Sequence, residues 1–186
     1  RRPKNRMGIK EEKAAVRAEM GLFRIRPEER MEVSEAIRDR LIAIESWRAA
    51  RTVLLYAPLP DEPDMFILPR GDKRFCYPRY HTDRGYGSAR VDDPAELTPG
   101  KFGVLEPDSS IPEMPASEVD LILLPGVAFD QDCYRLGRGR GFYDRWLLTL
   151  PGGKIGVGFD HQLLDRVPRE PHDVQLDGVI VPSRSV

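Results

Sequence analysis

The segment RLGRGRGFYD, from Arg135 to Asp144, combines residue types that bind anions. Its glycines let backbone N–H groups come close to a bound group, because glycine has no Cβ and adopts left-handed conformations. Its arginines offer guanidinium groups for phosphate oxygens, and the start of the helix that follows adds a partial positive charge. The segment therefore predicts a phosphate-binding loop. The glycines are Gly137, Gly139 and Gly141, and the arginines are Arg135, Arg138 and Arg140.

The chemistry of this segment leaves alternatives open. Asp144, in the first turn of the expected helix, would repel a bound phosphate unless a divalent cation bridged the two, but it could also simply stabilise the helix dipole. The segment matches neither a P-loop nor a dinucleotide fingerprint. A flexible RGG-like tract or an arginine-rich surface loop are the other interpretations. Apolar, periodic elements adjoin the segment on both sides, which favours an ordered loop.

Lys13 and Arg17 form a second basic pair on an expected helix from Ile9 to Leu22. On a helical wheel Lys13 shares a stripe with apolar residues, and Arg17 lies at the edge of that stripe. A lysine that points inward needs an anionic partner, and a shared phosphate would relieve the repulsion between the two cations. The alternative is that the lysine stem covers apolar surface while its ammonium group stays in water.

The rest of the chain indicates an α/β architecture. A second helix is predicted from Pro27 to about Trp47, and a third from Gly141 to Leu150, whose apolar residues share one face. The β-rich runs are continuously apolar, which is typical of parallel or mixed sheets covered on both faces by helices. Residues 81–118 are expected to be mostly irregular. The runs are TVLLYA, KRFCYP, GSARV, VDLILLP, KIGVGF and DGVIVP.

Length and composition narrow the class of protein. The 186 residues suit one domain, which we place at 9–186 after a basic segment, residues 1–8, that is a tail or a remnant of processing or cloning. Lys plus Arg (29) balance Asp plus Glu (30), so a global basic field for nucleic acid is excluded. Cys76 and Cys133 form no disulfide or zinc pattern, and no apolar run reaches the ~20 residues of a membrane helix. We expect a cytoplasmic protein without membrane contact.

The segment PGVAFDQDCYRLGRGRGFYD resembles the hallmark of 5-formyltetrahydrofolate cyclo-ligases, also called methenyltetrahydrofolate synthetases. The resemblance implies a Rossmann-like, three-layer α/β fold. It also implies conversion of 5-formyltetrahydrofolate to 5,10-methenyltetrahydrofolate with ATP as co-substrate and Mg²⁺ as cofactor, releasing ADP and phosphate. The partners would be these small molecules, and the protein a monomer. The alternatives are a paralogue that binds folate or nucleotide without catalysis, and an RNA-binding module that acts through the arginines.

The resemblance also assigns roles to residues. Lys13 and Arg17 match a pair that contacts ATP, while Ala57 and Glu62 in YAPLPDEPDM match the segment that binds folate. Asp144 and Asp177 match the two magnesium ligands. Cys133 stands where the family commonly has glycine, which would strain the chain if the site needs positive φ. The implied ATP contacts in the loop are Arg135, Leu136, Gly137, Arg138, Gly139, Arg140, Gly141, Phe142 and Tyr143. The implied loop contacts to the folate are Arg138, Gly139, Arg140, Gly141 and Phe142. The implied catalytic residues are Arg138, Arg140 and Tyr143.

Overall fold

The computed structural model describes residues 8–139 and 142–186. The predicted tail therefore lies outside the described residues apart from Gly8. So do the predicted roles of Arg140 and Gly141 and of the Phe142 side chain. Within the described part of the chain, no helix is long and apolar enough to cross a bilayer.

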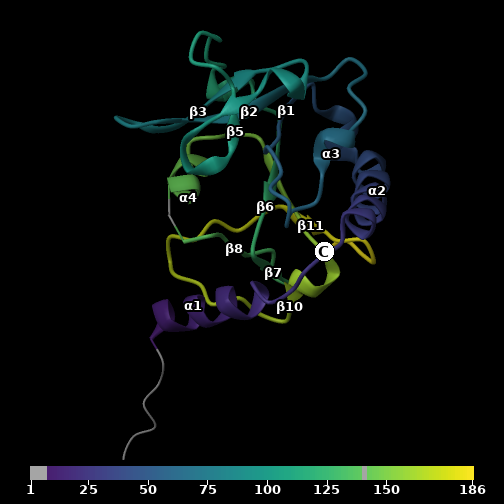
Figure 1. The fold of residues 1–186 in the computed structure, drawn as a ribbon, viewed down its shortest axis with the longest axis vertical. Coiled ribbons are helices and arrows are strands. Elements are labelled where there is room, and N and C mark those ends of the chain that lie inside the picture. The colour runs from purple at the N-terminus through teal and green to yellow at the C-terminus, as the bar shows by residue number, and fades with distance from the viewer. Residues whose placement is uncertain (1–7, 140–141) are drawn as a thin grey trace, which may run out of the picture.

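A mixed sheet forms the centre of the described chain, with strand order β11-β9-β6-β1-β2-β3 (Figure 1). All neighbouring strands are parallel except β2 and β3, which form an antiparallel hairpin at one edge. This arrangement confirms the predicted α/β class with a mostly parallel sheet. The bounds are β1 Thr52–Leu54, β2 Arg74–His81, β3 Gly85–Arg90, β6 Leu121–Pro125, β9 Gly153–Val157 and β11 Gly178–Ile180.

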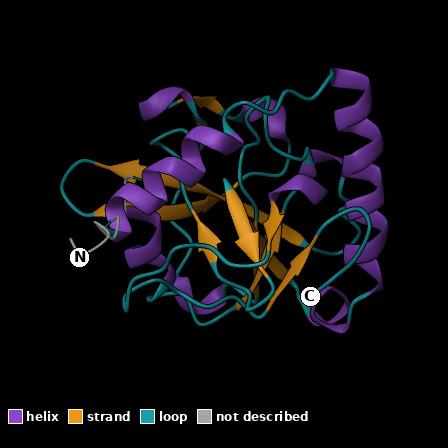
Figure 2. Cartoon of the chain, turned by 90° about the horizontal axis from the view of Figure 1, so that it is seen from below, coloured by secondary structure: helices purple, strands orange, loops and turns teal. Residues whose placement is uncertain are grey.

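Alternate residues of the buried strands enter two separate cores. On one face Val53 and Leu123 pack with Ile37 of α2 and Trp47 of α3. On the other face the apolar residues of β6, such as Ile122, pack with α4. The helices therefore cover both faces of the sheet (Figure 2), which explains why the strand sequences are apolar without a break. The helices are α1 Ile9–Met20, α2 Pro27–Ala43, α3 Glu45–Ala49 and α4 Phe142–Leu147.

A small second sheet, ordered β10-β7-β8, supports the predicted loop. Helix α1 packs against this sheet, where Met20 meets Ala128 and Leu136, and so lies apart from the helices on the central sheet (Figure 1). The strands are β7 Ala128–Asp130, β8 Arg135–Leu136 and β10 Leu163–Leu164, with a separate pair β4 Thr98–Pro99 and β5 Leu105–Glu106. The 3₁₀ helices are Met65–Ile67, Pro94–Glu96, Lys101–Gly103, Ala116–Glu118 and Asp160–Gln162.

Several boundaries differ from the sequence prediction: α1 ends at Met20 instead of Leu22, and α4 ends at Leu147 instead of Leu150. Two further differences have a physical reason. The helix expected to continue to Trp47 breaks at Ile44, whose ψ of 150° is extended, and the break lets Trp47 enter the core. Strand β2 continues through Pro78 to His81, although a proline normally ends a strand. Its pairing with β1 ends at Cys76, so Pro78 interrupts no hydrogen-bond ladder on that side.

Candidate functional site

A cavity of about 230 Å³, which we call the central cavity, lies at the carboxyl ends of β1 and β6. In open parallel sheets this edge is where ligands bind, because the loops that leave neighbouring strands diverge there. The cavity brings together the two residues predicted to bind folate, Ala57 and Glu62, and the described part of the glycine and arginine loop. Its lining includes Tyr56, Ala57, Leu59, Glu62, Tyr86, Phe102, Val104, Gly126, Arg135, Gly137, Arg138, Gly139, Tyr143 and Asp144.

The loop is tied to α1 at its start. Arg17 donates from Nε to the Gly137 carbonyl oxygen at 2.8 Å. Gly139 has φ of +96°, and a Cβ there would lie 3.2 Å from the Arg17 guanidinium carbon. The positive φ therefore favours glycine at this position, and a Cβ would in addition press on the end of the Arg17 side chain. Among the described residues no carboxylate forms an ion pair with Arg17, so its charge remains available to an anion.

Arg135 is occupied within the protein. Its guanidinium donates to the Pro125 carbonyl oxygen at 3.1 Å and to Asp144 Oδ1 at 2.6 Å. It also lies over the Tyr143 ring, 5.6 Å from the centroid. These contacts fix the carboxylate of Asp144 and the start of α4 beside the cavity. The predicted ATP contact from Arg135 would have to compete with them.

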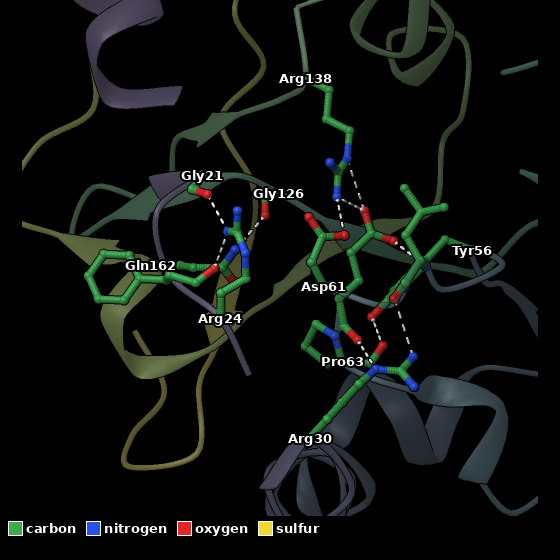
Figure 3. A network of polar contacts seen from close by, with 12 residues as sticks. Gly21, Arg24, Arg30, Tyr56, Asp61, Pro63, Gly126, Arg138 and Gln162 are labelled. Carbon is green, nitrogen blue, oxygen red and sulfur yellow. Dashed lines mark hydrogen bonds and ion pairs between the residues drawn. The ribbon is translucent and has the colours of Figure 1, made fainter. Parts of the chain in front are cut away.

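Arg138 and Glu62 face each other across the central cavity. Arg138 donates from Nη2 to Asp61 Oδ1 at 2.8 Å and to Glu62 Oε1 at 3.1 Å (Figure 3). Glu62 is 6% exposed, and its other oxygen accepts from the Leu59 N–H at 3.0 Å. Burial raises the pKa of Glu62 above its ordinary value, although the Leu59 N–H and Arg138 oppose that shift. The residue predicted to bind folate, Glu62, and the residue predicted to bind phosphate, Arg138, thus neutralise each other's charge in the free protein.

Helix α2 positions the segment that carries Glu62. Arg30 donates from Nε to the Glu62 carbonyl oxygen at 2.6 Å and lies 3.6 Å from the Asp64 carboxylate. The hydroxyl of Tyr56 donates to the Pro63 carbonyl oxygen at 2.6 Å (Figure 3). Sequence reasoning missed Arg30 because its partners are backbone atoms far along the chain, which leave no spacing pattern.

The hydroxyl of Tyr143 is buried at the cavity and has no hydrogen-bond partner among the described residues. Burial raises the pKa of Tyr143, so its phenol stays protonated at neutral pH. Tyr86 and Trp146 hold the ring from two sides, at centroid distances of 5.4 and 5.5 Å. A buried hydroxyl without a partner is unfavourable in the free protein, and a polar ligand in the cavity would satisfy it.

The lip of the cavity carries a second unusual residue. Phe102 has φ of +71°, a left-handed conformation that is rare for a phenylalanine. Its ring meets that of Tyr80 edge to face at 5.2 Å, and Lys101 lies over the same Tyr80 ring. No residue type or spacing in the sequence singles out Phe102. The strained backbone, which the sequence cannot display, is the signal that marks this residue.

Lys13 is buried as predicted, but its partners belong to the protein. Its Nζ donates to Asp173 Oδ2 at 2.7 Å and to Glu170 Oε2 at 2.9 Å. Burial lowers the pKa of Lys13, but the two carboxylates outweigh it and the net effect is upward. Glu170, His172 and Asp173 have ligand atoms within 4.8 Å of one another. Because the Lys13 ammonium already occupies this group, we assign no metal to it.

Asp173→Asn is expected to weaken the acid sensitivity of the fold. The pKa values of Asp173 and Glu170 lie below their ordinary 3.8 and 4.5, chiefly because Lys13 binds their charged forms against the effect of burial. Groups with lowered pKa stabilise the fold above their unfolded values and lose that contribution as pH falls through the folded values. Urea unfolding of both proteins at pH 7 and at about pH 3.5 measures how much free energy of unfolding each loses on acidification. An Asp173→Asn chain that loses as much stability on acidification as the wild type would contradict this expectation.

Asp177 does not join Asp144 in the structure. It precedes β11, and its Oδ2 accepts from the Lys154 N–H at 2.7 Å, at the amino ends of β9 and β11. The central cavity lies at the opposite, carboxyl ends of the parallel strands. The predicted two-aspartate magnesium site is therefore not assembled, because Asp177 closes the start of two strands instead. Asp144 remains the predicted metal ligand that borders the cavity.

Cys133 adopts φ of +62°, so the turn keeps the conformation that favours glycine. Asp130, fully buried, holds this turn by accepting from the Asp132 and Tyr134 N–H groups at 3.1 and 2.9 Å. Strain is therefore tolerated at Cys133.

We expect Cys133→Val to unfold at least ~1–2 kcal/mol more readily than Cys133→Gly, because a β-branched residue fits left-handed backbone poorly. Urea unfolding of the two variants measures this difference. Equal stability would show that the turn rearranges to negative φ.

Comparisons with known proteins agree with this geometry. The model of the 5-formyltetrahydrofolate cyclo-ligase family matches residues 9–182. A 5-formyltetrahydrofolate cyclo-ligase from Mycolicibacterium smegmatis is 34% identical over 178 residues, covering 84% of this chain and 90% of that protein. One from Escherichia coli K12 is 29% identical over 168 residues, covering 85% and 92%.

The fold is shared with a solved relative. The NMR structure of Aquifex aeolicus 5,10-methenyltetrahydrofolate synthetase superposes with a TM-score of 0.82 at 31% identity, covering 96% of this chain and 92% of that one. Sequence and fold match over nearly the full length, and the loop and cavity lie where ligands bind in such sheets. The chain therefore belongs to the 5-formyltetrahydrofolate cyclo-ligase family.

Proposed function

We propose that this protein converts 5-formyltetrahydrofolate to 5,10-methenyltetrahydrofolate with ATP and Mg²⁺, releasing ADP and phosphate. One observation carries the proposal. In a chain of the cyclo-ligase family, one cavity places a buried carboxylate and a hydroxyl that has no partner among the described residues against the glycine and arginine loop. Such a cavity offers partners for both a heterocycle and a phosphate.

Glu62 is the proposed partner of the pterin. The amino-pyrimidine edge of a pterin presents a pair of N–H donors, and a carboxylate accepts from both. Glu62 is buried and backbone-anchored, so little reorganisation accompanies binding. Ala57, Val104 and Phe102 supply apolar contacts beside it. The Tyr143 hydroxyl, which has no partner in the described part of the chain, would donate to a polar atom of the substrate.

The loop is the proposed site of the ATP phosphates. Gly137 and Gly139 border the central cavity, and together with Arg17 they also border a groove that contains Lys13. We propose phosphate contacts from these residues, with Arg135, Leu136, Arg140, Gly141 and Phe142 completing the loop. The bound phosphates would pair with Arg17, which forms no ion pair with the carboxylates of residues 8–139 and 142–186. The ammonium of Lys13 is positioned by its two carboxylate partners.

The reaction then needs positioning more than covalent help from the protein. The γ-phosphorus forms a bond to the formyl oxygen as its bond to ADP breaks, which makes the formyl carbon electrophilic. N10 attacks that carbon and loses its proton, and the carbon–oxygen bond breaks, so that the ring closes and inorganic phosphate leaves and takes up the proton. Arg138 and Arg140 are proposed to neutralise the charge that spreads over the transferring group. Arg138 would exchange Glu62 and Asp61 for phosphate oxygens as both substrates bind.

Asp144 is the proposed magnesium ligand. Mg²⁺ commonly binds through one or two carboxylates together with substrate phosphates and water, so a single aspartate at the cavity fits. Arg135 holds this carboxylate in place at 2.6 Å. When bound, the ion neutralises phosphate charge. Asp177 lies at the amino ends of the strands, away from the cavity, and is not part of this proposal.

We also propose that residues 9–186 fold as one domain and that a monomer suffices, because the match to the family covers 9–182 and one chain supplies the whole cavity lining. The free thiols of Cys76 and Cys133 suit the reducing environment of the cytoplasm.

The test mixes purified protein with 5-formyltetrahydrofolate, ATP and Mg²⁺ and follows the near-ultraviolet absorbance of the methenyl product. Product that requires ATP supports the proposal. Tight binding of both ligands without product would instead identify a non-catalytic member of the family. Salt-sensitive RNA binding without binding of either small molecule would favour the nucleic-acid alternative.

A further inference from the structure

A hairpin formed by β4 and β5, residues 98–106, makes one side of the central cavity. We call it the lip hairpin. Its strands pair over two residues each, and the Gly100 N–H donates to the Val104 carbonyl oxygen at 2.9 Å. A hairpin of this size is not stable by itself, so its position depends on the rest of the protein. Its residues that line the cavity are Lys101, Phe102, Val104, Leu105 and Glu106.

Arg79 of β2 binds the segment that follows the lip hairpin. Its Nη1 donates to the Asp108 carbonyl oxygen at 2.7 Å and to the Ile111 carbonyl oxygen at 2.8 Å. The Ile111 N–H also donates to the Asp108 carbonyl oxygen, at 3.1 Å, so the guanidinium binds both ends of one turn, residues 108–111. This turn begins two positions after Glu106, the last residue of the lip hairpin. It therefore fixes the point at which the lip hairpin rejoins the body of the protein.

The environment of Arg79 is costly for an arginine. The residue is 7% exposed, and its Nε has no hydrogen-bond partner among the described residues. A buried N–H without a partner is unfavourable, and a methionine would occupy similar space without that penalty. Packing alone therefore does not explain an arginine at this position. Its bonds to the two carbonyl groups of the turn do.

Strand β2 contributes both to the cavity and to the turn. Pro78 lines the central cavity, and Arg79, on the opposite face of the strand, binds the turn. The Tyr80 N–H donates to Glu106 Oε2 at 3.2 Å, where β5 lies beside β2 (Figure 1). Strand β2 is itself paired with β1 and β3 in the central sheet. Arg79 thus links the position of the lip hairpin to a strand that the sheet holds in place.

The segment after the turn is anchored by other contacts. Glu113 Oε1 lies 2.7 Å from His81 Nε2, and the Met114 N–H donates to the Ser88 carbonyl oxygen at 2.8 Å. These contacts connect the segment to the β2–β3 hairpin without Arg79. Loss of the Arg79 guanidinium is therefore expected to loosen the turn and the lip hairpin and to leave residues 113–114 in place.

We infer that Arg79 is a positioning residue, which binds the turn at residues 108–111 and so holds the lip hairpin in the conformation that receives the folate substrate. The inference rests on the proposed function, which places the folate in the central cavity. Arg79 is not among the described residues that line this cavity, so it acts through the lip hairpin. Its loss should weaken binding of the folate more than it slows the chemical step, because Arg138 and the glycine loop lie on the other side of the cavity.

The test replaces Arg79 in the full chain. Arg79→Met keeps an apolar stem but removes the donors, and we expect its KM for 5-formyltetrahydrofolate to rise about tenfold while kcat and the KM for ATP stay within about twofold. Arg79→Lys keeps a charged donor and should bring the folate KM back to within about threefold of the wild-type value. Hydrogen exchange of the free proteins should be faster in Arg79→Met at the Gly100 and Ile111 amides and unchanged at the Met114 amide.

Two further variants serve as a control and as an independent approach to the turn. Arg74 begins the same strand but pairs with Glu118 at 3.4 Å, so Arg74→Met should change neither the folate KM nor the exchange of the lip hairpin. Asp108 is exposed, and its Oδ1 accepts from the Ser110 N–H at 2.9 Å. Asp108→Ala loosens the turn without disturbing the core, and it should raise the folate KM about threefold even if Arg79→Met does not fold.

The inference is overturned if folded Arg79→Met keeps the wild-type folate KM, or if its kcat falls while that KM stays unchanged. If Arg79→Met does not fold, a wild-type folate KM in Asp108→Ala overturns it. Failure of the proposed function is distinct, since the wild type would then form no product. In that case the exchange measurement still decides whether Arg79 holds the lip hairpin, and equal exchange in wild type and Arg79→Met would overturn that role.

Discussion

Arg138→Ala is expected to lower kcat by about a thousandfold while the protein remains folded. The guanidinium lies between Glu62 and the glycine loop, 46% exposed and free to exchange its carboxylate partners for a phosphoryl group. Removal of an arginine that neutralises a transferring phosphoryl group commonly lowers turnover by about 10³ or more. Steady-state product formation measures kcat, and thermal unfolding measures the fold.

Two variants sharpen this prediction. Arg138→Lys keeps the charge but loses the planar fork, so an intermediate kcat is expected. Arg48→Ala removes an exposed arginine from α3, which lies against the core that faces away from α4, and should leave kcat unchanged. Turnover of Arg138→Ala within about fivefold of the wild type would place the phosphoryl group elsewhere. A loss of folding would instead assign Arg138 a structural role as the partner of the buried Glu62.

Glu62→Gln should raise the KM for 5-formyltetrahydrofolate by about ten- to a hundredfold and leave the KM for ATP nearly unchanged. The change preserves shape but removes the charge that would accept two N–H donors, and hydrogen bonds to a charged group contribute about 1.5–3 kcal/mol. It also removes the charge from one of the two carboxylate partners of Arg138, the one at 3.1 Å, and leaves the ion pair with Asp61. Initial rates over both substrate concentrations separate the two KM values.

Asp61→Asn is the matched control for Glu62→Gln. Asp61 forms the same ion pair with Arg138, at 2.8 Å, but is exposed and does not line the central cavity. The KM of the Asp61→Asn variant for 5-formyltetrahydrofolate should stay within about threefold of the wild-type value. If both variants raise the folate KM equally, the effect comes from Arg138 and not from a carboxylate that binds the pterin. If Glu62→Gln leaves that KM unchanged, the pterin does not bind here.

The strands and their mixed, mostly parallel order could be predicted because burial on both faces leaves a continuous apolar run, as in LILLP of β6. The break at Ile44 could not, since Glu45 to Ala49 is as helical in composition as the residues before it. The break is decided by Trp47, which gains a place in the core that a straight helix would deny it. Local propensity does not encode that gain.

The site shows a similar division. The loop, Ala57 and Glu62 stand out in the sequence because contiguous residues carry their pattern. They line one cavity, and their binding roles stay predictions. The partners of the charged groups could not be. Lys13 meets Glu170 and Asp173 from the other end of the chain, and Arg135 turns to Asp144. For Asp177 the error runs the other way. A motif match predicted that it binds metal, but the fold places its carboxylate at the amino ends of the strands, away from the cavity.

The most direct test of the central claim follows the formyl oxygen of the substrate. The protein is mixed with ATP, Mg²⁺ and 5-formyltetrahydrofolate labelled with oxygen-18 in the formyl group, and the released inorganic phosphate is analysed by mass spectrometry. Phosphoryl transfer to that oxygen predicts one labelled oxygen in each phosphate released with the methenyl product. Unlabelled phosphate, with the label lost to water, would contradict the account.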